Sequence, residues 1–279
     1  MQPVEPILVG DLFLELHSEL LALLHALPAA DWDKPTAAAP WTVRDMVAHL
    51  LDTDMRLLSF RRDGLPPPDP DKPIGSYAEL VAHVDQVNAE WVTAARRISP
   101  RLMIDLHALV GPQVHAFLRH LDPYASSRGP VSWAGEELAP NWFDLAREYT
   151  EKWHHQMHIR EAVGAPGLTS RHFLHPVLNT FVRALPHVYR KVPASEGTQV
   201  QLEITGEAGD TWTLLREGSQ WHLYLGAGTV LSARVRVDQD IAWHLFTKGI
   251  SPETARRQAQ IDGDESLGEP MLHTVSIIA

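Results

Sequence analysis

Side chains of the kinds that bind metals are concentrated between residues 142 and 163 of this 279-residue chain. Two pairs there are spaced four residues apart, Glu151 with His155 and His154 with His158. Side chains four residues apart lie one turn apart on one face of an α-helix, so either pair can hold one ion. The two faces differ by most of a quadrant or more, and we therefore expect that both pairs do not serve the same ion. Spacing alone leaves both pairs open.

A third ligand must come from another helix, and His49 is the best candidate. It lies inside the apolar stretch 46–51, in the middle of a predicted helix. A neutral ring in such surroundings needs a partner, because an unpaired buried polar group costs roughly 1–3 kcal/mol. A hydrogen bond to a carbonyl or carboxylate in the core is the alternative to metal binding, and both stay open.

The remaining histidines have no ligand-type partner at helical spacing that stands out, and scattered surface or helix-end positions explain them. They are His17, His25, His83, His107, His115, His120, His172, His175, His187, His222, His244 and His273. The sequence contains no glycine-rich phosphate loop, no G-x-S-x-G elbow and no dinucleotide fingerprint.

The composition excludes several classes of partner. Lys and Arg number 24 against 35 Asp and Glu, which gives a formal charge of −11 and no basic face for nucleic acid. No apolar stretch approaches the roughly 20 residues needed to span a bilayer, and no secretory signal is visible, so we expect a cytoplasmic protein without a membrane partner. The absence of cysteine excludes a protein thiol as nucleophile or metal ligand.

Apolar periodicity predicts an α+β protein of two domains. Helical patterns cover residues 10–27, 42–62, 76–98, 100–121, 142–163 and 171–191, which together indicate an all-helical bundle. Alternating patterns predict four strands at 199–205, 211–215, 221–225 and 233–237, followed by short helices at 241–247, 252–258 and 267–272. The predicted domains are 1–192 and 193–279.

Three segments of the first domain carry a resemblance to a known family. Residues 41–50 (WTVRDMVAHL), 147–156 (REYTEKWHHQ) and 159–164 (IREAVG) resemble the N-terminal domain of the mycothiol-dependent maleylpyruvate isomerase family, a branch of the DinB-like metal-binding four-helix bundles. Residues 209–213 (GDTWT) and 263–267 (GDESL), with DIAW between them, resemble that family's small C-terminal domain, which is similar to sterol carrier proteins. The resemblance covers nearly the whole chain.

The resemblance implies a metal site made by one histidine on the second helix and a Glu and a His four residues apart on a later helix. It selects His49, Glu151 and His155, and it leaves His154 as a neighbour. His158 stands where relatives often carry Asp or Gln, so the surroundings of the site differ. Three ligands leave one position open, as in catalytic zinc sites. Zinc is the first choice, and nickel, iron or cobalt would accept the same ligands.

The implied activity is that of an isomerase or S-transferase that uses a low-molecular-weight thiol such as mycothiol as cosubstrate. The substrate is expected to be a small anion, and Arg56, two turns after His49 on the same helix face, is the candidate for its contact; Arg44, Arg147 and Arg160 are possible by position.

Two other functions stay open. One is a metal-dependent hydrolase in which metal-bound water attacks and Glu148 or His158 acts as the base. The other is a non-enzymatic binding protein for a small apolar molecule. We expect a monomer or a homodimer in each case.

Overall fold

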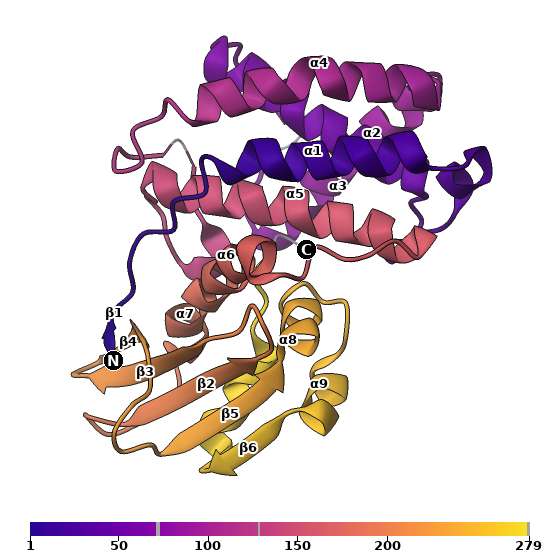
Figure 1. The fold of residues 1–279 in the computed structure, drawn as a ribbon. Helices are drawn as coiled ribbons and strands as arrows, with labels where there is room; N and C mark the ends of the chain where they lie inside the picture. Colours follow the sequence, from indigo (N-terminus) through magenta and orange to yellow (C-terminus); the bar gives the residue numbers. More distant parts are fainter. Residues whose placement is uncertain (71–72, 128, 278–279) are drawn as a thin grey trace. The chain divides into compact units, whose positions relative to one another are not determined.

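The computed structural model describes residues 1–70, 73–127 and 129–277, and it has the predicted α+β architecture (Figure 1). Its internal contacts divide it into two compact units. The helical unit consists of Val9–Asp122 and Tyr149–Leu168, and the sheet unit consists of Met1–Leu8, Pro123–Glu148 and the described residues from Thr169 onward. These units alternate along the chain, so the predicted boundary between residues 192 and 193 stays a prediction.

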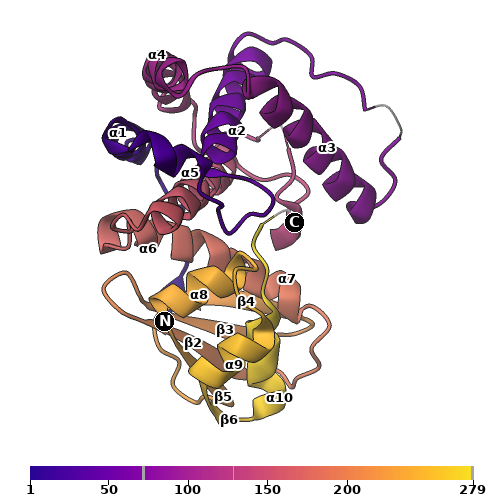
Figure 2. The same ribbon diagram turned by 90° about the vertical axis from the view of Figure 1, so that its right-hand side faces the viewer.

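Among the described residues, the helical unit contains five α-helices, of which α5 begins in the sheet unit. They are α1 (Leu12–Ala26), α2 (Val43–Arg56), α3 (Tyr77–Ala95), α4 (Pro100–Leu118) and α5 (Asn141–Val163), with a short 3-10 turn η1 (Ala29–Asp33). In it α2 packs against α3 and α4, and α1 packs against α4, as Figure 2 shows from the side. The buried core includes Leu20, Leu24, Trp32, Met46, Val47, Leu50 and Met103.

Local sequence explains where α2 begins, and α2 continues directly into a π-helical segment. The Thr42 side chain accepts a hydrogen bond from the Asp45 backbone at 3.3 Å, and the Asp45 carboxylate accepts one from the Thr42 backbone at 3.1 Å, which is the predicted capping box. The helix predicted to reach residue 62 does so, but its last part, η2 (Leu57–Arg62), is π-helical. π-Helical turns are rare and occur frequently at functional sites.

The sheet unit contains a six-stranded sheet in the order β1-β4-β3-β2-β5-β6, in which β2 and β5 are parallel and the other pairs antiparallel. The strands are β1 (Gln2–Pro3), β2 (Gln199–Thr205), β3 (Thr211–Glu217), β4 (Gln220–Leu225), β5 (Ala233–Asp238) and β6 (Gln260–Gly263). The helical elements are η3 (Ser132–Ala134), α6 (Arg171–Phe181), η4 (Val182–Ala184), α7 (Leu185–Tyr189), α8 (Gln239–Phe246), α9 (Pro252–Gln258), α10 (Glu265–Gly268) and η5 (Glu269–His273).

Three elements of the sheet unit differ from the sequence prediction. Strands β1 and β6 were not expected, because the first is two residues long and the second has only Ile261 as an apolar side chain. The helix predicted over 171–191 is divided into α6, η4 and α7, and Pro186 stands in the first turn of α7, where proline is tolerated. Among the described residues, no helix combines the length and apolarity that a bilayer crossing requires.

Candidate metal centre

His49 lies in the middle of α2 and is buried, with 6% of its surface exposed. Its ring contacts the ring of His155 on α5, with centroids 4.7 Å apart and planes at 88°. The indole of Trp41 packs on another side of it at 4.9 Å. The two histidines chosen from the sequence therefore meet across two helices of the helical unit.

Glu151 is the second residue of α5 that the sequence predicts as a ligand. Its Oε2 atom lies 3.2 Å from Nε2 of His155, one helical turn further on. The Nδ1 atoms of His49 and His155 are buried and have no hydrogen-bond partner among the residues that the structure describes. Two imidazoles with an unused nitrogen each and one carboxylate fit a divalent transition metal, so the donor set agrees with the implied site. The structure places His49 against His155 and Glu151 against His155.

Burial favours the neutral form of the His49 ring. The pKa of His49 is lowered to about 3, mainly by desolvation; the nearby His155 ring acts in the same direction, and the Glu151 carboxylate opposes both effects. A neutral imidazole retains the lone pair that a cation needs, because ligand histidines must be deprotonated. The ring is thus held in its ligand form at neutral pH.

The pair His154 and His158 lies closer to His155 than the sequence suggested. One ring nitrogen from each of these three residues lies within 4.8 Å of the others, and the centroids of His154 and His158 are 4.1 Å apart. The expectation that the two pairs do not serve the same ion stays a prediction, because Glu151 is not part of this group. This group is an alternative donor set that shares His155.

The other candidate residues have partners in the protein. Arg56 lies with Nε 3.1 Å from Asp52 Oδ2 and donates to Asn88 at 3.2 Å. Arg160 is buried and ion-paired to Glu19 at 3.0 Å, which makes it a structural residue. The charges of both arginines are partly compensated inside the helical unit.

Arg44 donates at 2.7 Å to the carbonyl of Ile98, a structural contact within the helical unit. Glu148 belongs to the sheet unit and lies 3.6 Å from Arg147, so its role as a base stays a prediction.

The sequence reasoning missed one cluster. Nitrogens of His17 and His107 and a carboxylate oxygen of Asp54 all lie within 4.8 Å of one another. The surface or helix-end position expected for His107 was wrong, because this residue is fully buried. Each of the three residues comes from a different helix, so residue spacing within one helix cannot predict the cluster. The one available signal was the position of His107 between the apolar residues Met103 and Val110.

Comparison with known proteins places the helical unit in a family. A family model described as the mycothiol maleylpyruvate isomerase N-terminal domain matches residues 13–160, more than half of the chain. The chain belongs to this family. Membership of the maleylpyruvate isomerase family indicates an enzyme.

More distant similarity extends over most of the chain. Two uncharacterised proteins, one from each of two strains of Mycobacterium tuberculosis, are 26% identical to it over 212 residues, which is 74% of this chain and 75% of theirs. The crystal structure of a point mutant of the mycothiol-dependent maleylpyruvate isomerase is 13% identical, with a TM-score of 0.50 over 85% of this chain and 86% of that one. This second likeness shows a shared fold.

Proposed function

We propose that the protein is a metal-dependent isomerase or S-transferase of the maleylpyruvate isomerase type, with a low-molecular-weight thiol such as mycothiol as cosubstrate. The observation that carries the proposal is the meeting of His49 from α2 with Glu151 and His155 from α5. It is supported by the family match over the same helices.

His49, Glu151 and His155 would hold the cation, with zinc as the first choice for two nitrogens and one oxygen. A divalent cation in this place supplies a Lewis acid that favours the thiolate form of a bound thiol at neutral pH. Since the chain has no cysteine, the sulfur nucleophile must belong to the cosubstrate.

The surrounding residues position these ligands and the substrate. Trp91 donates its indole hydrogen to the carbonyl of Ala48 at 2.7 Å, and together with Trp41 it fixes the section of α2 that carries His49. Arg56, held by Asp52, places a positive charge two turns along α2, where a carboxylate of an anionic substrate would be attracted. His158 is a candidate for proton transfer, because its ring lies 5.7 Å from that of His155.

In the proposed isomerisation the thiolate sulfur adds to one carbon of an activated double bond, the new single bond rotates, and elimination restores the double bond and the free thiolate. In the transferase alternative the sulfur displaces a leaving group and stays attached. The first reaction returns the thiol unchanged, and the second consumes one thiol for each product.

The test is metal content by mass spectrometry, followed by turnover of maleylpyruvate with and without thiol. We expect His49→Ala, Glu151→Ala and His155→Ala each to lose one metal equivalent per chain that the wild type retains, and to lose thiol-dependent turnover. The exposed His25 on α1 gives a matched control, His25→Ala, which should retain both. A loss in His154→Ala with retention in His49→Ala would instead assign the donor set to His154, His155 and His158.

Two outcomes would refute the proposal. Turnover that is independent of thiol but dependent on metal would identify a hydrolase. A wild-type protein that is purified without metal and takes up no zinc on titration would leave a binding protein as the function.

A further inference from the structure

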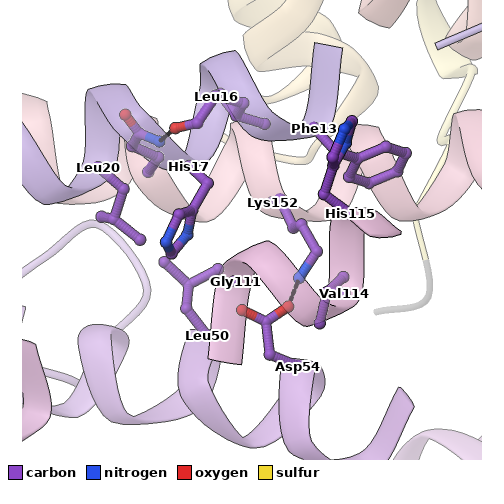
Figure 3. A pocket seen from close by; sticks show the side chains of 11 residues that line it. Phe13, Leu16, His17, Leu20, Leu50, Asp54, Gly111, Val114, His115 and Lys152 are labelled. Atoms are coloured by element: carbon purple, nitrogen blue, oxygen red, sulfur yellow. Dashed lines mark hydrogen bonds and ion pairs between the residues drawn. The ribbon is translucent and has the colours of Figure 1, made fainter. Parts of the chain in front are cut away.

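A second group of ligand-type side chains lies in the helical unit, outside the centre described above. His17 comes from α1, Asp54 from α2 and His107 from α4, and one ligand atom of each lies within 4.8 Å of the other two. Beside them is a cavity of about 30 Å³, lined by His17 and Asp54 and also by Lys152 of α5 (Figure 3). A space of this size holds a water molecule or a single cation.

His107 keeps one ring nitrogen that no protein group uses in the described part of the chain. Its Nε2 lies 3.0 Å from the carbonyl oxygen of Val47, which can only accept, so Nε2 carries the hydrogen. Burial lowers the pKa of His107 to about 4, so the ring is neutral and its other nitrogen, Nδ1, has no hydrogen. That Nδ1 is buried without a hydrogen-bond partner in the described part of the chain. Histidines that bind metals are held in the same way, with the second nitrogen donating to a carbonyl.

The His17 ring is seated against the backbone of α4. A Cβ atom on Gly111 would lie 2.2 Å from Nε2 and Cε1 of His17, so only glycine at this position leaves room for the ring. Glycine in the interior of a helix is normally unfavourable. The Nε2 atom of His17 is likewise buried without a hydrogen-bond partner among the described residues.

Asp54 supplies the negative charge. It is 5% exposed, and its Oδ1 is ion-paired to the ammonium of Lys152 (Figure 3). A buried carboxylate needs a cation, and a lysine ammonium and a metal ion are alternative counterions for it. The other carboxylate oxygen, Oδ2, is not part of that ion pair.

We propose that His17, Asp54 and His107 form a second site for a divalent transition metal, of which zinc is the best match, and that the ion cross-links α1, α2 and α4. The two nitrogens and one oxygen are the donors zinc prefers, and the cavity provides the place for a water ligand. Asp54 follows His49 by five residues, about 140° around α2, so the two centres use different faces of that helix.

The first experiment counts zinc per chain after equilibrium dialysis. We expect two ions in the wild type, one in His49→Ala, one in His17→Gln and none in the double variant His49→Ala/His17→Gln. Asp54→Asn provides a second route to the same loss without a change of side-chain size. The helical circular-dichroism signal of each variant shows that the count refers to folded protein.

The counts separate this proposal from the function proposed above. If His49→Ala loses one zinc ion and retains the other, the result concerns the first centre and leaves the second site intact. The second site is refuted if folded His49→Ala binds no zinc, or if neither His17→Gln nor Asp54→Asn lowers the count.

Lys152→Met tests the proposal through the direction of the change in zinc affinity. In the His49→Ala background, removal of the competing ammonium should tighten zinc binding by at least about tenfold, because the positive charge beside Asp54 is lost. The matched control is Lys191→Met, an exposed lysine, which should leave zinc binding unchanged. Weaker zinc binding in Lys152→Met would overturn the proposal.

Discussion

Replacing Gly111 by alanine changes the contact between α1 and α4 at one point. The added methyl group would lie 2.2 Å from the His17 ring, and all three of the atoms nearest to it belong to that ring. The ring must rotate out of its place, and such overpacking costs about 1–3 kcal/mol. Alanine also gains about 1 kcal/mol of helix propensity over glycine, and the following Pro112 opposes this gain because it disfavours helical backbone before it. We therefore expect Gly111→Ala to lower the free energy of unfolding by about 2 kcal/mol.

The same substitution in a His17→Ala background should be close to neutral, because the clashing ring is absent. The measurement is a double-mutant cycle by urea unfolding, with an expected coupling of about 2 kcal/mol between positions 17 and 111. Effects that add to within about 0.5 kcal/mol would refute the placement of the ring on the α4 backbone. Gly111→Ala should also lose the zinc ion assigned to His17 while retaining the ion at His49.

Three further predictions concern other parts of the molecule. Burial raises the pKa of Asp45, but hydrogen bonds from Arg96 and Thr42 outweigh it and lower that pKa. The stabilising effect of the Asp45 carboxylate is therefore complete above about pH 4 and is lost as the pH falls through the lowered pKa. Asp45→Asn should lower the free energy of unfolding by about 1 kcal/mol at pH 7 in urea, and this difference should disappear in acid. Tyr189→Phe removes a buried hydrogen bond of 2.5 Å to the carbonyl of Leu267, and it should cost about 1–2 kcal/mol in the same assay, whereas no change would show that the carbonyl finds another donor. Chelation of metal should lower the midpoint of thermal unfolding by about 5–10 °C, reversed by added zinc, and an unchanged midpoint would show that no bound ion stabilises the fold.

The helices of the first 190 residues could be predicted because their signals are local. The capping box of Thr42 and Asp45 fixes the start of α2, and apolar side chains at steps of three and four mark its buried face. The pairing of β2 with β5 in parallel could not be predicted, because it joins segments separated by two other strands and no local pattern records it. Strand β6 has only one apolar side chain, so its place at the sheet edge depends on its partner β5.

The proposed metal centre could be predicted in part, because some of its residues also have local signals in the sequence. Glu151 and His155 lie on one helix and their spacing records their common face, whereas His49 was chosen by its apolar surroundings together with the family resemblance. The cluster at His17 has one member on each of three helices. Its detection requires the packing of α1 and α2 on α4, which the sequence patterns do not specify.

In the described part of the helical unit, buried nitrogens of His49 and His107 lack a hydrogen-bond partner, unlike several polar groups around them. Gln156 is buried too, but its amide donates to the carbonyl of Leu16 at 3.0 Å, and Arg160 is bound by Glu19. Those groups are satisfied within the protein. Among the described residues nothing bonds to Nδ1 of His49 or of His107, and an unsatisfied buried polar atom costs about 1–3 kcal/mol that a ligand can recover. Such atoms next to a carboxylate favour a cation as that ligand, which is the basis of the proposal for each of the two centres.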